Sequence, residues 1–114
     1  MSDKSELIAQ QNDQFRRSMG DCAIPGKAVT TMGFAALEEA QRNAIVQAVI
    51  DYDDFTQDND PYEEYDFGVI ALPEMEKVFW KFDYYDASLE HGSEDPSDFT
   101  QTHRVLTIML ASEY

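Results

Sequence analysis

Apolar residues recur along the chain in two periods, and the change of period separates helices from strands. A first helix is predicted between Ser5, a good N-cap, and Gly20, a good helix stop. Its apolar positions follow at near-helical spacing: Leu7, Ile8, Phe15 and Met19. A wider apolar stripe predicts a longer helix over residues 35–51. The stripe consists of Leu37, Ala40, Ala44, Ile45, Ala48, Val49 and Tyr52.

Four short segments rich in β-branched and aromatic residues predict strands at 28–33, 65–72, 77–85 and 104–111. Alternation in the third places Val78, Trp80, Phe82 and Tyr84 on one face, which we expect to be buried. The connection at 73–77 is expected to be a hairpin. The order helix, strand, helix, strand, strand, strand predicts an α+β fold, with two helices packed on one face of a small antiparallel sheet.

The size and composition of the chain predict one folded domain over residues 1–114. Its 114 residues are 43% hydrophobic and 12% aromatic, which is enough for a core. The single Cys22 has no partner for an internal disulfide, and the N-terminus shows no charged-then-apolar leader. The apolar runs are far shorter than a membrane span. We therefore expect a soluble, cytoplasmic protein.

Charge is distributed unevenly along the chain. The formal net charge is −15, of which residues 1–42 contribute −1 and residues 43–114 contribute −14. Binding to nucleic acid or to anionic membranes depends on Lys and Arg, so this charge opposes both, and direct binding to nucleic acid is the class that it excludes. It would attract basic proteins and speed encounter with them. Solubility alone is an equally good explanation of the charge.

The strongest concentration of charge is a segment connecting the second helix to the sheet at about residues 51–66, here called the acidic segment. It holds eight acids in sixteen residues, with no Lys or Arg: Asp51, Asp53, Asp54, Asp58, Asp60, Glu63, Glu64 and Asp66. If extended at about 3.3 Å per residue, it carries one acid per roughly 6.6 Å, inside the Debye length of about 8 Å. Hydrogen bonds, a cation or a partner must offset that repulsion. A turn formed by the segment itself is the purely structural alternative.

A divalent-cation site is one functional interpretation of the acidic segment. The EF-hand pattern fails, since counting from Asp54 puts Asn59 at position six and Tyr65 at position twelve. An irregular site would use Asp58, Asp60 and Asp66. A metal-dependent hydrolase would use the acids of the segment with Asp83 and with His91 or His103. Residues 43–114 hold only three basic residues for a phosphate substrate, so the sequence favours a protein that is not an enzyme and has no cofactor.

Four ordered blocks of the chain resemble a known family. They are "DDFTQDNDPYEEYDFG", "FWKFDYYD", "GSEDPSD" and "RVLTIMLASEY". Together they are similar to the signature blocks of a bacterial domain-of-unknown-function family, number 3768. The chain departs from it at Tyr65, where the resemblance leads us to expect histidine before Asp-Phe-Gly. The resemblance implies a bacterial protein often encoded by mobile genetic elements, and it implies no activity.

The hypothesis favoured by the sequence is an acidic interaction protein that binds a basic protein surface. A DNA-mimic-like inhibitor of a nucleic-acid-binding protein is its sharpest form, with residues 83–98 as a second acidic segment. The predicted partner-binding residues are Asp53, Asp54, Asp58, Asp60, Tyr62, Glu63, Glu64 and Tyr65. The sequence gives neither the identity of the partner nor the oligomeric state.

Overall fold

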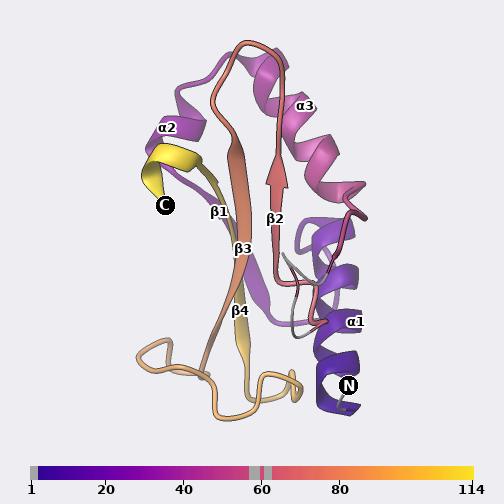
Figure 1. The fold of residues 1–114 in the computed structure, drawn as a ribbon. Helices are drawn as coiled ribbons and strands as arrows, with labels where there is room; N and C mark the ends of the chain where they lie inside the picture. The colour runs from indigo at the N-terminus through magenta and orange to yellow at the C-terminus, as the bar shows by residue number, and fades with distance from the viewer. Residues whose placement is uncertain (1–2, 57–59, 61–62) are drawn as a thin grey trace.

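The computed structural model describes residues 3–56, 60 and 63–114, and it has the predicted α+β class. Its elements follow one another in the order α1 (Asp3–Ser18), β1 (Gly26–Thr30), α2 (Met32–Ala35), α3 (Glu39–Ile50), β2 (Phe67–Ile70), β3 (Val78–Tyr85), β4 (His103–Leu110) and the 3₁₀ helix η1 (Ala111–Glu113). Figure 1 shows α1 and α3 together on one side of the sheet, as expected from the sequence. None of the helices in these described ranges is both long and apolar enough to cross a bilayer.

The four strands form one mixed sheet in the order β1-β4-β3-β2. The pairs β2–β3 and β3–β4 are antiparallel, as predicted. The pair β1–β4 is parallel, with Gly26 opposite Arg104 and Thr30 opposite Ile108. A parallel pair needs a long crossover connection, and here every element from α2 to β3 lies between the two strands. The sheet is therefore mixed rather than wholly antiparallel.

The core lies between this sheet and the two long helices. The predicted core face of β3 is buried at Val78, Trp80 and Phe82, and Tyr84 is half-buried. Gly68 is opposite Trp80 in the β2–β3 register, and the indole occupies the space that a side chain at Gly68 would need. The helices contribute further buried apolar residues to this cluster: Phe15, Ile45 and Val49.

The helix predicted over residues 35–51 begins later in the structure, as α3 over Glu39–Ile50. The separate short helix α2 precedes it and includes residues 32 and 33, where the sequence predicted the end of a strand. Ala36 ends α2, and Glu38 starts α3 with a capping box in which the Gln41 side chain accepts a hydrogen bond from the Glu38 backbone N–H. Phe34 in α2 is buried, as are Ile45 and Val49 in α3. The alanines around Leu37 favour a continuous helix. The helix is nevertheless broken just before Glu38, because α2 and α3 each bury their own apolar residues and Glu38 caps the start of α3.

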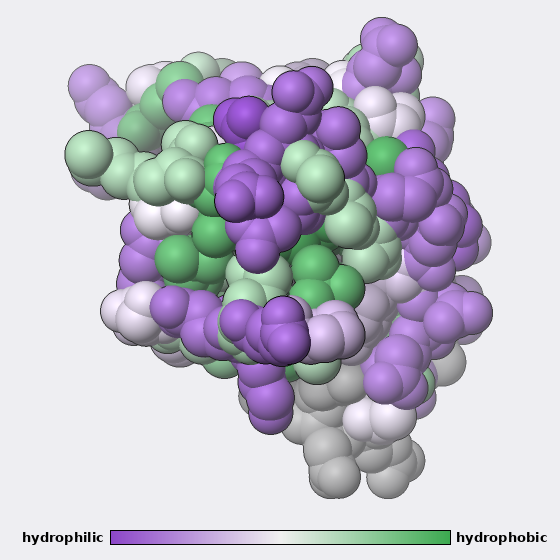
Figure 2. Space-filling view, turned by 90° about the horizontal axis from the view of Figure 1, so that it is seen from above, coloured by the Kyte–Doolittle hydropathy of each residue, from purple (hydrophilic) through white to green (hydrophobic). Residues whose placement is uncertain are grey.

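Apolar residues gather at the end of the molecule formed by α2 and the β2–β3 connection. Met32 in α2 is 88% exposed, and Leu37, Leu72 and Met75 are half-buried. Figure 2 looks onto this end and shows hydrophobic surface in a hollow bordered by hydrophilic residues. The acidic segment enters β2 at its other end, beside α1 (Figure 1), so the two surfaces are separate.

Candidate functional site

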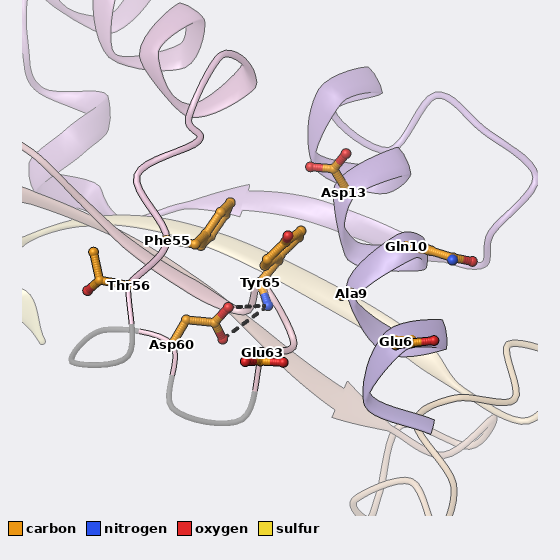
Figure 3. Close-up of a pocket in the computed structure, with 9 residues that line it drawn as sticks. All are labelled: Glu6, Ala9, Gln10, Asp13, Phe55, Thr56, Asp60, Glu63 and Tyr65. Atoms are coloured by element: carbon orange, nitrogen blue, oxygen red, sulfur yellow. Dashed lines mark hydrogen bonds between the residues drawn. The ribbon is translucent and has the colours of Figure 1, made fainter. Parts of the chain in front are cut away.

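A cleft of about 530 Å³ lies between α1 and the acidic segment. One wall is α1 and the other is the acidic segment, so the site joins parts of the chain that are about fifty residues apart (Figure 3). Its lining, as far as the structure describes it, contains no Lys, Arg, His or Cys. The lining residues are Glu6, Ala9, Gln10, Asp13, Phe55, Thr56, Asp60, Glu63 and Tyr65.

The acidic segment contributes an aromatic wall to the cleft. The rings of Phe55 and Tyr65 are stacked, with centroids 4.1 Å apart and an angle of 14° between planes. Phe55 also makes edge contacts with Tyr52 and Trp80, which connect it to the core. The guanidinium of Arg16 lies 5.6 Å from the Phe55 centroid. This part of the segment is therefore docked on the core, as the density of aromatics in the sequence suggests.

Asp60 organises the backbone of the acidic segment. Its side chain is buried, with Asp60 only 4% exposed, and it accepts hydrogen bonds from the N–H groups of Glu64 and Tyr65 at 2.9 and 3.2 Å. Glu63 and Tyr65 have φ angles of 57° and 54°, in the left-handed region that non-glycine residues rarely adopt. These hydrogen bonds, donated by backbone N–H groups to the Asp60 carboxylate, hold this turn closed.

The carboxylates of the cleft differ in how far they are neutralised. Asp13 pairs with Arg16 and Arg17 on its own helix, so its charge is offset. Glu6 and Glu63 are exposed, and neither has an ion pair within the described residues. Glu6 and Glu63 are therefore the two carboxylates of the cleft that remain free to meet a cation from outside.

Glu64 and Asp66 adjoin the cleft without lining it. Both are half-buried. Burial raises the pKa of the Glu64 carboxyl, with contributions from the nearby charges of Asp66 and Asp60. Burial likewise raises the pKa of the Asp66 carboxyl, and Asp60 adds to the effect. The raised pKa of these two carboxyls predicts that the stability of the protein depends on pH.

A buried polar network secures this end of the segment to α1 and β4. Asn12 donates to the Glu64 carbonyl at 3.0 Å and to the Tyr84 hydroxyl at 2.8 Å. The fully buried Arg104 donates to Asn12 Oδ1 at 2.8 Å, and its guanidinium lies 5.3 Å from the Tyr84 ring centroid. Burial raises the pKa of the Tyr84 hydroxyl well above its ordinary value, so it stays protonated. The network is structural support for the turn at Glu64.

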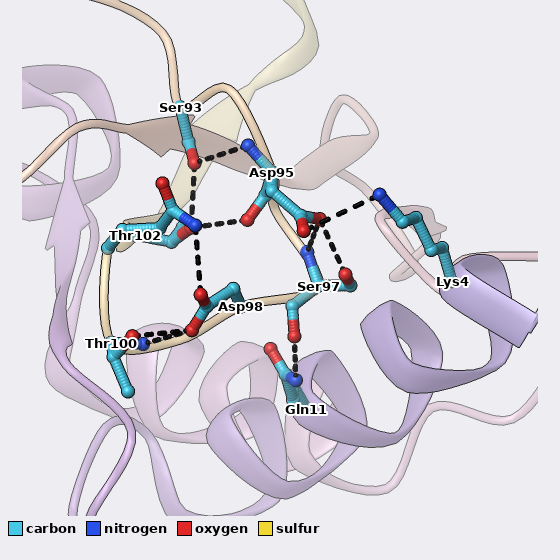
Figure 4. Close-up of polar contacts among 9 residues, drawn as sticks. Lys4, Gln11, Ser93, Asp95, Ser97, Asp98, Thr100 and Thr102 are labelled. Carbon is cyan, nitrogen blue, oxygen red and sulfur yellow. Dashed lines mark hydrogen bonds and ion pairs between the residues drawn. The ribbon is translucent and has the colours of Figure 1, made fainter.

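The second acidic segment, residues 83–98, uses its acids in a different way. Asp95 accepts hydrogen bonds from Ser97, and Asp98 accepts them from Thr100 and Gln101 (Figure 4). These hydrogen bonds lower the pKa of both carboxyls. Lys4 in α1 pairs with Asp95 at 3.5 Å. None of the acids in this segment lines the cleft.

The structure places the predicted partner-binding residues in several environments. Asp60, Glu63 and Tyr65 line the cleft, whereas Glu64 is beside it. Asp53 and Asp54 are exposed outside the cleft. Asp58 and Tyr62 lie outside the described residues. The part of the cleft that α1 supplies was not predicted, because no sequence pattern connects that helix to the acidic segment.

The metal interpretation concerns Asp58, Asp60 and Asp66. Asp58 is outside the described residues, and Asp60 uses its carboxylate on backbone amides. Within the part of the chain that the structure describes, no three His, Cys, Asp or Glu side chains are gathered as a metal site. A divalent-cation site remains a prediction.

Comparison with known proteins gives a family and no relatives of known function. No curated protein and no solved structure matches the chain. One family model matches residues 30–113, a range that includes the acidic segment and all of β2, β3 and β4 but not α1. The match covers most of the chain and agrees with the resemblance found in its sequence blocks. The chain therefore belongs to the family described as "Protein of unknown function (DUF3768)".

Proposed function

We propose that this protein is a non-enzymatic, bacterial interaction protein that binds a positively charged protein surface through the cleft between α1 and the acidic segment. The observation that carries the proposal is the lining of the cleft. It combines four carboxylates with two half-buried aromatic rings, and its described part contains no basic residue. Exposed acids steer basic partners toward such a site, and aromatic residues dominate binding energy at protein interfaces.

The partner class that we propose is a nucleic-acid-binding protein, with this chain acting as an inhibitor at its nucleic-acid site. The basic surface of such a partner is shaped to neutralise phosphates, and a dense set of carboxylates competes for the same Lys and Arg side chains. The net charge of −14 over residues 43–114 supports this reading. The mobile-element association of the family resemblance directs the search to proteins that restrict foreign DNA.

The test is capture of partners at several salt concentrations, followed by competition with DNA. We expect basic proteins to be retained at about 50 mM NaCl and released by about 500 mM, since charge-dominated binding weakens steeply with salt. Each retained protein is then purified, and duplex DNA is added to the complex. A partner bound at its nucleic-acid site is displaced by the duplex.

A pair of charge-matched variants distinguishes binding at the cleft from attraction by the overall negative charge. Glu6→Gln/Glu63→Gln removes two exposed carboxylates of the cleft and should lower retention. Glu39→Gln/Glu74→Gln removes two exposed acids outside the cleft and should retain the partner like the unmodified protein. Equal loss in both variants, or no retained protein at low salt, would contradict the proposal.

A further inference from the structure

We infer that the cleft is a socket for one arginine side chain of the basic partner, with the guanidinium against the Phe55–Tyr65 pair and near Glu63 and Glu6. This inference rests on the proposed function, and it names the group that the site selects. The cleft volume of about 530 Å³ falls within the range of roughly 300–1,000 Å³ that is typical of small-molecule sites. The site is therefore concave and has room for an inserted side chain, unlike a flat protein surface.

The aromatic pair gives the socket a flat wall. Phe55 and Tyr65 are nearly parallel, and both rings are half-buried, so part of their surface stays accessible from the cleft. Figure 3 shows the two rings on the segment side of the cleft, facing α1. A planar guanidinium stacks on an aromatic face more favourably than a compact, strongly hydrated ammonium does.

The protein already places guanidinium groups on aromatic rings elsewhere. Arg16 lies 5.6 Å from the Phe55 centroid and 5.2 Å from that of Trp80. Arg104 lies 5.3 Å from the centroid of Tyr84. Arg16 also pairs with Asp13, so a guanidinium between a ring and a carboxylate is an arrangement that this fold contains beside the cleft. Tyr65 and Glu63 present the same two groups, a ring and a carboxylate, in the cleft, and no Lys or Arg in the described part of the chain contacts either of them.

The carboxylates determine the charge that the socket accepts. Glu63 lies within the turn that Asp60 closes, and Glu6 projects from α1 on the other wall. Both are exposed, and neither forms an ion pair within the described part of the chain. A guanidinium has five donors in a planar fork that matches carboxylate oxygens, whereas an ammonium is a point charge. Arginine is therefore favoured over lysine.

The test compares three capped ten-residue peptides that differ at one central position. Each contains the same four lysines, and the central residue is arginine, lysine or the neutral citrulline. Amide chemical shifts of the protein are followed during titration at fixed ionic strength. We expect the arginine peptide to bind about fivefold more tightly than the lysine peptide, with the largest shifts at Ala9, Glu63 and Tyr65. The citrulline peptide should bind weakest.

Variants at Tyr65 assign the preference to the ring. Tyr65→Leu should remove the preference for arginine and leave lysine binding nearly unchanged, whereas Tyr65→Phe should keep it. If Tyr65→Leu fails to fold, Glu63→Gln tests the same socket without touching the rings, and it should weaken the arginine peptide more than Glu74→Gln does.

The outcomes separate this inference from the proposed function. Equal binding of arginine and lysine peptides, with salt-sensitive affinity, would overturn the socket and leave the interaction protein intact. Absence of binding by every peptide at low salt, together with absence of a captured partner, would overturn both. An arginine preference that survives Tyr65→Leu would place the selective group elsewhere and overturn the socket.

Discussion

Asp60 and Glu63 are three residues apart in the acidic segment, yet their carboxylates have different tasks. Asp60 is buried and accepts backbone N–H groups, so it shapes the turn. Glu63 is exposed and lines the cleft without a described ion pair. An experiment that replaces Asp60 would therefore confuse loss of the turn with loss of binding, whereas replacing Glu63 removes charge alone.

At the same scale, Glu64 and Asp66 predict an unusual pH dependence of stability. The pKa of each carboxyl is raised, so the folded protein holds protons at these sites more tightly than the unfolded chain does. Their contribution to the free energy of unfolding is complete below the ordinary pKa values of 4.5 and 3.8. It is lost as pH rises through the raised values. We expect urea unfolding to show higher stability as pH is lowered from 7 toward the ordinary values of 4.5 and 3.8.

The double variant Glu64→Gln/Asp66→Asn identifies the source of that dependence. This variant should reduce the gain in stability at lower pH, whereas the charge-matched Glu39→Gln/Glu74→Gln should keep that gain. Asp86, Asp95 and Asp98 act in the opposite direction, because hydrogen bonds lower their pKa. Their stabilisation is lost only as pH falls through values below the ordinary 3.8. A rise that persists unchanged in Glu64→Gln/Asp66→Asn would contradict the assignment.

At the scale of elements, Arg16 joins α1 to the end of α3. Its guanidinium is fully buried and donates to the carbonyls of Val49 and Ile50, in the last turn of α3. Arg16→Met removes the charged donor from both carbonyls, although Val49 keeps the backbone N–H of Tyr52, and it removes the ion pair with Asp13. Loss of a charged donor to buried carbonyls costs about 1.5–3 kcal/mol, which urea unfolding would measure. Amide exchange should accelerate in the last turn of α3.

The neighbouring Arg17 provides the control for this substitution. Arg17 pairs with the same Asp13, but its side chain is half exposed. Arg17→Met should cost no more than about 1 kcal/mol, as is usual for surface ion pairs. Similar losses in the two variants would show that Arg16 acts only as a partner of Asp13 and not as a cap of α3.

The elements also show how far the sequence predicts this molecule. The alternation in β3 was sufficient to identify its buried face, because the opposite face carries the charged Lys81 and Asp83. The parallel pairing of β1 with β4 was not predicted, since strand patterns carry no information about direction. The cleft was not predicted either, because sequence patterns do not show which segments pack together. Glu6 is one acid on a nearly neutral stretch of sequence, and only tertiary packing brings it to Glu63.

For the whole molecule, the remaining question is what balances a net charge of −15. Part of the answer lies in hydrogen bonds, because Asp60, Asp95 and Asp98 accept them within the chain. Glu6 and Glu63 have no such compensation from a described cation. A protein partner, general screening by salt and a bound divalent cation are three ways to supply it. Only a bound divalent cation would make the stability of the protein depend on which ion is added.

Thermal unfolding at fixed ionic strength distinguishes screening by salt from a bound divalent cation. If the acids await a protein partner, Mg²⁺, Ca²⁺, Mn²⁺ and Zn²⁺ should each give the same small change in Tm, and a chelator should give none. A specific cation at about one hundred times its Kd would instead add near 2.7 kcal/mol, several degrees for a domain of this size. A saturable shift with one ion, lost in both Asp58→Asn and Asp66→Asn, would establish a metal site. The carboxylates would then be held by that ion rather than kept for a basic protein.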